Sequence, residues 1–208
     1  MKENTSINSI VLNQLLPNNI TKDSVLQLFQ NTDKTIFVNE DDRSFVNIDE
    51  NFFFNNKRFI LKNTTIGKLI ELIIKEKNYL NVLNIGSTTG FTSVLLSKIS
   101  NYVISLESER SLHEKEKKII KNLDIKNIYS VCGNLENGLK EYFPYDLIFV
   151  NGGIKKKPNI LLEQLNESGY LICIEQTNIN IKKIVRYFKK KDIIEKKTYY
   201  SVNSPILF

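Results

Sequence analysis

The stretch that decides the fold reads Asn81-Val82-Leu83-Asn84-Ile85-Gly86-Ser87-Thr88-Thr89-Gly90-Phe91, and an apolar segment follows over residues 91–96. The first apolar run stops at Gly86 and apolar residues resume after Gly90, which predicts a buried strand, a tight turn and a helix. The first N–H groups of such a helix are free and face the end of the strand. The stretch therefore predicts a cradle for a nucleotide-like ligand.

An acidic residue follows the next apolar run. Residues 102–106 lead into Glu107, which lies about twenty residues after Gly86, the spacing at which an open α/β sheet places an acid to hold ribose hydroxyls. The glycine pattern alone is weak, because a G-x-G-x-x-G loop has three glycines and this loop has Thr88 between Gly86 and Gly90. An ordinary structural turn is the alternative interpretation. Gly86 and Glu107 together form the primary candidate site.

The order of apolar runs predicts the rest of the core. Strands are expected at residues 80–85, 102–106, 128–132, 145–150 and 169–174, with helices at 90–98 and 109–123. Strands separated by helices of this length favour a parallel sheet with right-handed crossovers. Such a sheet binds its ligand beyond the carboxyl ends of its strands. This geometry would bring Gly86, Glu107, Asn134 and Asn151 to one rim.

Several segments in this order resemble the successive motifs of class I S-adenosylmethionine-dependent methyltransferases. They are Leu83-Asn84-Ile85-Gly86, Glu107, Gly133-Asn134, residues 144–148 and residues 161–171. The resemblance is closest to the protein-L-isoaspartate O-methyltransferase family, and it extends to residues 13–23, Phe37-Val38 and residues 204–208. It implies a doubly wound, mostly parallel seven-stranded sheet with an antiparallel C-terminal strand pair. It also implies an N-terminal helical flank, residues 1–63, packed on a methyltransferase core, residues 64–208.

The resemblance also implies a cofactor, a substrate and site residues. The cofactor would be S-adenosylmethionine, and the methyl acceptor would be the carboxylate of an isoaspartyl residue in a protein or peptide. The implied cofactor-binding residues are Asn84, Gly86, Ser87, Thr88, Gly90, Phe91, Glu107, Ser108, Asn134, Leu135 and Asn151. Lys62 and Asn63 stand where the family has a serine and a proline that hold the substrate carboxylate. They are candidate substrate-binding residues, and Lys62 either pairs with that carboxylate or faces solvent.

Three departures from the family pattern predict a weakened cofactor site. Asn84 and Asn134 stand where many relatives have acids, and Thr88 stands where a second glycine is usual. A neutral amide forms weaker hydrogen bonds than a carboxylate does. A catalytically inactive methyltransferase-like protein that acts through protein contacts is therefore the alternative. A nicotinamide oxidoreductase is disfavoured by the glycine spacing and by the expected antiparallel strands.

Composition limits the other classes of function. A chain of 208 residues with 41% hydrophobic and 25% charged residues fits one α/β domain. No apolar run has membrane-spanning length and residues 1–6 lead into no signal-peptide core, so a cytoplasmic protein is expected. The net charge of +6 comes with lysine runs at 115–118, 155–157 and 189–191. These runs are scattered and nearly lack arginine, which argues against a nucleic-acid partner.

The cysteines and the histidine carry little chemistry in this interpretation. With two cysteines, one histidine and no C-x-x-C pair, no metal site is expected. Cys132 and Cys173 are predicted to be reduced, buried thiols at the ends of core strands. His113 lies in a charged run that reads as a solvated helix face, so catalysis by a histidine base is not expected.

The ends of the chain are predicted from local signals. Helices are expected at residues 4–15, 22–30 with Thr21 as N-cap, and 64–75, with a loop-rich connection at 39–56. The N-terminal segment should lie across the sheet edge as a lid or substrate-side flank. Near the C-terminus, Ile181, Ile184, Val185 and Phe188 have helical spacing. Strands at 183–189 and 193–202 are nevertheless preferred, because β-branched and aromatic residues are abundant there.

Overall fold

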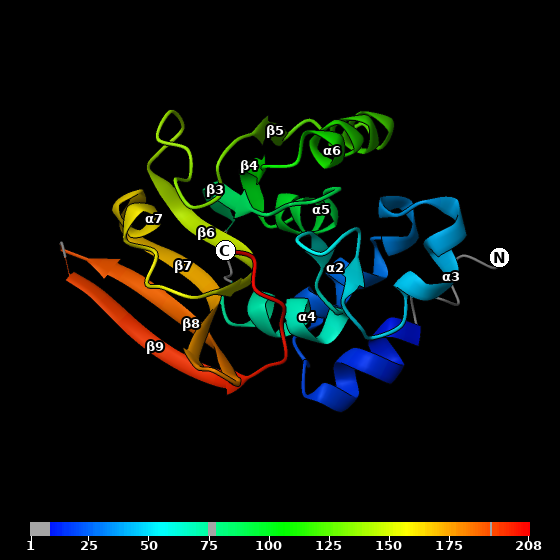
Figure 1. The fold of residues 1–208 in the computed structure, drawn as a ribbon, viewed down its shortest axis with the longest axis horizontal. Helices are drawn as coiled ribbons and strands as arrows, with labels where there is room; N and C mark the ends of the chain where they lie inside the picture. Colours follow the sequence, from blue (N-terminus) through cyan, green and yellow to red (C-terminus); the bar gives the residue numbers. More distant parts are fainter. Residues whose placement is uncertain (1–8, 75–77, 192) are drawn as a thin grey trace.

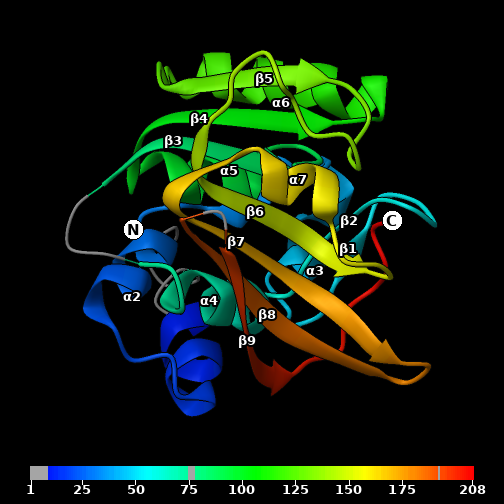
Figure 2. The same cartoon turned by 90° about the vertical axis from the view of Figure 1, so that its left-hand side faces the viewer.

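A seven-stranded sheet forms the centre of the computed structural model, which describes residues 9–74, 78–191 and 193–208 (Figures 1 and 2). The strand order is β5-β4-β3-β6-β7-β8-β9. The parallel strands are β3 (Tyr79–Ile85), β4 (Ser100–Glu107), β5 (Ile128–Cys132), β6 (Tyr145–Ile154) and β7 (Leu165–Asn178). β8 (Ile181–Lys190) and β9 (Ile193–Ser201) complete the sheet in antiparallel pairing. The predicted fold class is confirmed.

The strand order reverses at the centre of the sheet, between β3 and β6. The chain runs outward from β3 through β4 to β5, and then returns to β6 on the other side of β3. Ile85 at the end of β3 pairs with Val150 of β6. The crossover connections on the two sides of this pair diverge, so the carboxyl ends of β3 and β6 flank the place where open α/β sheets bind ligands.

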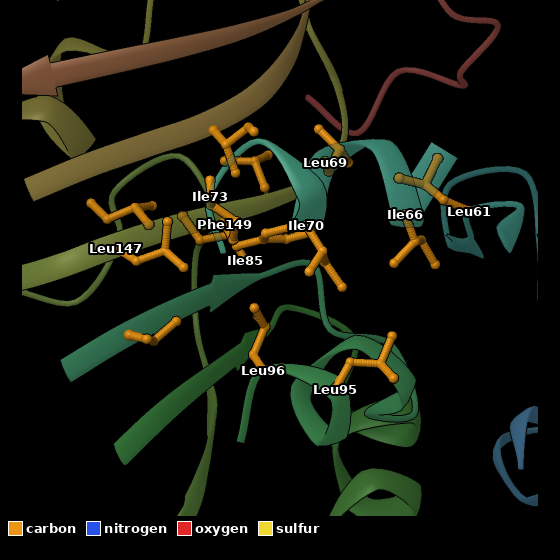
Figure 3. Close-up of a cluster of buried hydrophobic side chains, with 14 of the residues drawn as sticks. Leu61, Ile66, Leu69, Ile70, Ile73, Ile85, Leu95, Leu96, Leu147 and Phe149 are labelled. Atoms are coloured by element: carbon orange, nitrogen blue, oxygen red, sulfur yellow. The ribbon is translucent and has the colours of Figure 1, made fainter. Parts of the chain in front are cut away.

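Helices cover both faces of the parallel strands because each strand is apolar on both sides. α5 (Phe91–Ser97) and α6 (Arg110–Asn122) contact β4 and β5. α4 (Asn63–Glu71) lies on the opposite face, and α7 (Asn159–Glu163) follows β6. Figure 3 shows Ile70 and Ile73 directed at Ile85 and Phe149 from one side, with Leu96 on the other. This burial of branched apolar side chains is the main stabilising contribution to the core.

The N-terminal elements pack beside the sheet, where Figure 1 draws them in blue and cyan. They are η1 (Val11–Leu15), η2 (Leu16–Asn18), α2 (Asp23–Gln30), η3 (Lys34–Phe37), η4 (Glu40–Asp42), α3 (Arg43–Val46), β1 (Phe52–Phe53) and β2 (Phe59–Ile60). Leu15, Val25 and Phe29 anchor them in the common core. The hydroxyl of Thr89 in the β3–α5 loop donates to the carbonyl of Phe37 at 2.6 Å. The N-terminal elements therefore contact the predicted ligand loop directly.

Two local predictions in this segment need correction or restriction. The helix predicted at residues 4–15 lies partly outside the described residues, and its described end is the π-helix η1. The N-cap of α2 is Lys22 and not Thr21, and no side chain caps this helix. Thr21 is held instead through its backbone N–H, which donates to Glu71 at 3.0 Å. A tertiary contact thus replaces the local cap.

The C-terminal region forms strands, as predicted, and then returns to the centre of the molecule. β8 and β9 pair in register from Lys190 and Ile193, so the helical spacing of their apolar residues is overridden. After β9, Ile206 forms a parallel bridge with Gly153. Gly153 N–H donates to the Pro205 carbonyl at 2.8 Å, and Leu207 N–H donates to the Gly153 carbonyl at 2.7 Å. The C-terminal segment, drawn in red in Figure 1, therefore pairs beside the carboxyl end of β6.

Candidate cofactor site

Left-handed residues make the turn between β3 and α5. Gly86 has φ +73°, Thr88 +54° and Gly90 +99°. Glycine adopts these angles without strain, whereas a β-branched residue at such an angle is an outlier. The turn directs the N–H of Thr88 back toward the end of β4.

The side chain of Glu107 meets this loop. Its carboxylate is fully buried, and Oε2 accepts the Thr88 N–H at 2.9 Å. Oε1 accepts the N–H groups of Ser108 at 2.8 Å and Glu109 at 2.9 Å. The loop after Gly86 and the acid at the end of β4 therefore lie at the same rim.

Arg58 closes this rim from the N-terminal segment. Its Nε donates to Glu107 Oε1 at 2.7 Å, and its terminal nitrogens donate to the Ser108 hydroxyl and the Lys57 carbonyl. Arg58 is 8% exposed, so the ion pair is largely shielded from water. The guanidinium thus occupies one oxygen of the carboxylate that the sequence predicts to hold ribose hydroxyls. Sequence reasoning missed Arg58, because the ion pair joins two segments that are distant in the sequence.

Leu207 of the C-terminal segment covers the glycine face of the rim. A Cβ added at Gly86 would lie 2.7 Å from Leu207 Cδ2, and one at Gly152 would lie 2.8 Å from Leu207 Cβ. The ring of Phe59 lies equally close to Gly152, at 2.9 Å from such a Cβ. Only glycine leaves room for these apolar contacts. The space above Gly86 is thus filled by one leucine side chain.

Two asparagines near the carboxyl ends of β3 and β6 satisfy each other. Asn151 Nδ2 donates to Asn84 Oδ1 at 2.6 Å and to the Ile85 carbonyl at 2.9 Å. Asn84 Nδ2 donates in turn to the hydroxyl of Ser93 at 2.8 Å. Asn84 is fully buried and Asn151 is 4% exposed. The amides form a closed polar network at the position predicted to contact the cofactor.

Other predicted residues lie at different depths. The Ser87 hydroxyl donates to Glu116 at 2.9 Å and so points beneath the loop. The Phe91 ring packs against Phe37, with centroids 5.4 Å apart. Ser108 and Asn134 are exposed, and Leu135 is buried. The side chains of Ser87 and Phe91 therefore face the core, and the exposed pair lies at the outer rim.

The two candidate substrate-binding residues have partners within the chain. Lys62 Nζ lies 3.9 Å from Asp49 Oδ2. Asn63 is fully buried, accepts from Lys34 Nζ at 3.1 Å and donates to Gln14 at 2.9 Å. Lys34 is itself fully buried, and this burial lowers its pKa to about 7, against the opposing charge of Asp49. A role of Lys62 and Asn63 in substrate binding stays a prediction.

The prediction for Cys173 is confirmed, and the predictions for Cys132 and His113 are wrong. Cys173 is buried, as expected, and burial raises its pKa, but Cys132 is exposed. His113 is not solvated: it is 7% exposed, and its Nδ1 lies 2.8 Å from the Ser130 hydroxyl. It faces inward because it lies directly after Leu112 and one turn before Glu116, which are buried on the same face of α6. Among the described residues, no group of three metal-ligand side chains and no helix able to cross a membrane is found.

Comparisons with known proteins agree with this geometry. The sheet order, its reversal between β3 and β6, and a glycine loop facing an acid are those of the class I S-adenosylmethionine-dependent methyltransferase fold. The sequence model of the protein-L-isoaspartate(D-aspartate) O-methyltransferase family matches residues 6–204. The chain therefore belongs to this family.

Individual relatives match over part of their length. A protein-L-isoaspartate O-methyltransferase of Thermotoga maritima is 34% identical over 116 residues, which are 54% of this chain and 37% of that protein. One of Helicobacter pylori is 30% identical over 139 residues, 66% of this chain and 65% of that protein. These alignments span between about a third and two thirds of the curated relatives.

A solved structure covers the fold more completely. A Plasmodium falciparum protein described as a protein-L-isoaspartate O-methyltransferase, in complex with S-adenosyl-L-homocysteine, superposes with a TM-score of 0.80 at 20% identity. The superposition covers 99% of this chain and 97% of that one. At this identity the match establishes the shared fold.

Proposed function

We propose that this protein transfers the methyl group of S-adenosylmethionine to the carboxylate of isoaspartyl residues in proteins or peptides. The observation that carries the proposal is the family match over residues 6–204. The hydrogen bond from the Thr88 N–H to Glu107 Oε2, 2.9 Å long, supports the proposal. Both are the kind of group that would hold the ribose and the carboxylate end of the cofactor.

The residues present fit the cofactor in kind. Glu107 would hold the ribose, Ser108, Asn134 and Leu135 would flank the adenine, and Asn84 would face the methionyl ammonium. The obstacles are the ends of two side chains, Arg58 and Leu207, which reach the rim from the N-terminal and C-terminal segments. Side-chain rotation can clear such obstacles without a change of fold.

The chemistry requires little beyond alignment. The cofactor supplies a sulfonium methyl group that is already activated. A carboxylate acceptor needs no general base, so the absence of a histidine from the rim is compatible with the reaction. The chain's task is to hold the carboxylate in line and to exclude water. Phe59 and Leu207 are apolar and lie beside Gly152, where they would keep water from the acceptor.

The ion pair at the rim is a further reason to expect weak cofactor binding, beside the residues at positions 84, 88 and 134 that depart from the family pattern. Cofactor binding must break the Arg58–Glu107 ion pair, whose Nε–Oε1 distance is 2.7 Å. A hydrogen bond to a charged group contributes roughly 1.5–3 kcal/mol, so this competition can weaken affinity by about tenfold or more. An inactive descendant is the second candidate, and the closed rim is the observation that favours it.

Two measurements separate the candidates. Calorimetric titration with S-adenosylhomocysteine should give micromolar binding for the enzyme, whereas an inactive descendant would show none at millimolar concentration. The Glu107→Gln variant should bind at least tenfold more weakly, because it loses the charge that accepts from ribose hydroxyls. Transfer of labelled methyl groups to an isoaspartyl peptide, with the normal aspartyl peptide as control, tests the acceptor. Equal labelling of both peptides would contradict the isoaspartyl assignment.

The proposal includes no nucleic-acid partner. Residues 181–201 carry eight basic and two acidic side chains, which account for the entire net charge of +6. The cations are therefore less scattered than the sequence runs indicated. However, neighbouring register pairs, Arg186 with Lys197 and Tyr187 with Lys196, place them alternately on the two faces of the hairpin. This distribution suits a charged edge that resists strand pairing with other chains.

A further inference from the structure

A second carboxylate lies beneath the predicted cofactor loop. Glu116 of α6 is fully buried, and it interrupts the apolar stripe between Leu112 and Ile120. Among the residues the structure describes, no lysine, arginine or histidine forms an ion pair with it. A buried carboxylate without a cation is costly unless hydrogen bonds satisfy it. Its partners therefore indicate what it does.

Four serine hydroxyls surround Glu116, and each comes from a different element of the site. Ser87 of the loop and Ser130 of β5 donate to Oε2 at 2.9 and 2.7 Å. Ser93 of α5, at 2.9 Å, and Ser105 of β4 donate to Oε1. The loop also packs on the side chain itself, since a Cβ at Gly90 would lie 3.0 Å from Glu116 Cγ. One carboxylate thus ties the loop to the helix and the strands that support it.

We propose that Glu116 is a positioning residue for the cofactor loop, and that it exchanges its proton with solvent through Ser130 and His113. The inference rests on the proposed function, because the loop it positions is the one that would bind the cofactor. An ionised Glu116 accepts all four hydroxyls at once. A protonated Glu116 must donate from one oxygen, so one serine has to turn and accept, and the loop loses part of its support.

The path to solvent is continuous. His113 Nδ1 lies 2.8 Å from the Ser130 hydroxyl, and His113 Nε2 lies 3.9 Å from Glu114 at the exposed side of α6. When Glu116 is protonated, it donates to Ser130, Ser130 donates to Nδ1, and His113 carries its proton on Nε2. On deprotonation the Glu116 proton moves to the Ser130 oxygen, the Ser130 proton moves to Nδ1, and the Nε2 proton leaves to water. One proton is released, and His113 changes from the Nε2–H to the Nδ1–H tautomer.

The electrostatic surroundings favour this exchange. Burial raises the pKa of Glu116, and the four serine hydrogen bonds oppose this shift. Burial lowers the pKa of His113, which favours the neutral ring that this exchange requires. The charged groups that act on His113 are Glu107, Arg110, Glu114 and Lys117. Cofactor affinity should therefore fall as the pH falls through the raised pKa of Glu116.

Nitrogen-15 NMR of the imidazole tests the proton path. The chain has one histidine, so its signals are unambiguous. In the wild type, rising pH should convert His113 from the Nε2–H to the Nδ1–H tautomer. In Glu116→Gln the tautomer should stay constant over the same range, while Lys121→Gln, an exposed change on the same helix that lies outside the proton path, should behave as the wild type. A wild-type tautomer that never changes, or one that changes identically in Glu116→Gln, would overturn the proton path.

Hydrogen exchange of the loop amides, residues 87–90, tests the positioning without any cofactor. Glu116→Gln should speed this exchange about tenfold, and should weaken S-adenosylhomocysteine binding about tenfold, or ~1.4 kcal/mol, with loss of its pH dependence. Glu116→Asp keeps the charge and should recover part of both effects, and the exposed Lys121→Gln should change neither. Unchanged loop exchange in Glu116→Gln would sink the inference. A wild type that binds no S-adenosylhomocysteine would defeat the proposed function alone, because the exchange data stand without ligand.

Discussion

Two glutamates lie fully buried within the same site, and their surroundings differ. Glu107 has a guanidinium at 2.7 Å and three backbone N–H groups. Glu116 has four serine hydroxyls and no ion-pair partner among the described residues. Backbone amides and arginine can only donate, whereas a hydroxyl can donate or accept. The first environment therefore demands a charged carboxylate, and the second tolerates either protonation state.

The largest expected effect on the free energy of unfolding comes from neutralising Glu107, and the same change at Glu116 is the comparison. Glu107→Gln should lower the free energy of unfolding by about 3 kcal/mol, because it leaves the Arg58 guanidinium buried without its counter-ion. Glu116→Gln should lower it by only about 1–1.5 kcal/mol, because serine hydroxyls can reverse to meet an amide. Urea unfolding at one pH measures both. Equal losses in the two variants would mean that the partners of the two acids are equivalent, and the comparison would fail.

Lys34 extends the comparison to a buried cation without a carboxylate in hydrogen-bond contact. Its hydrogen bonds go to the Leu61 carbonyl at 3.3 Å and to Asn63 Oδ1 at 3.1 Å, and burial lowers its pKa to about 7. Between that value and the unfolded pKa the unfolded chain binds more protons, so stability should rise with pH. The slope approaches ~1.4 kcal/mol per pH unit, or about 2 kcal/mol from pH 7 to 8.5.

Unfolding of Lys34→Met at several pH values tests this slope. The variant should lose the rise, since methionine does not titrate, and the exposed Lys121→Met should keep it. If Lys34→Met shows the same rise as the wild type, other groups cause it, and Lys34 is charged in the folded protein.

The two acids also differ in how far the sequence predicts them. Two local signals predict Glu107 as a site residue: it ends an apolar run, and it lies about twenty residues after Gly86. The order of the apolar runs along the chain predicts the fold. No local signal predicts Arg58, the partner of Glu107, because 49 residues separate the two and only the folded N-terminal segment brings them together. Leu207 is missed for the same reason. Glu116 lies in the charged run at residues 109–118, which predicts a solvated helix face, although its i±4 spacing from Leu112 and Ile120 places it on the apolar stripe.

Arg58 permits a test of how the ion pair acts on ligand binding. If the guanidinium competes with ribose hydroxyls, Arg58→Met should bind S-adenosylhomocysteine about tenfold more tightly, even though it is less stable. The exposed Arg110→Met is the matched control and should bind as the wild type does. Calorimetric titration measures both. Weaker binding by Arg58→Met would show that Arg58 supports the bound state and does not compete with the ligand. The Arg58–Glu107 ion pair would then persist when the ligand is bound.

The smallest effect concerns the loop residue whose amide reaches Glu107. Thr88 holds φ +54°, which strains a β-branched residue, although its hydroxyl donates to the Ser87 carbonyl at 2.7 Å. Thr88→Gly removes the strain and the hydroxyl, and should raise the free energy of unfolding by about 0.5–1 kcal/mol. Thr89→Gly is the matched control: Thr89 has no positive φ and donates to Phe37, so this change should cost ~1 kcal/mol. Because Thr88→Gly keeps the N–H that Glu107 accepts, a loss as large as that of Thr89→Gly would mean that the threonine side chain, and not the backbone angle, governs the loop.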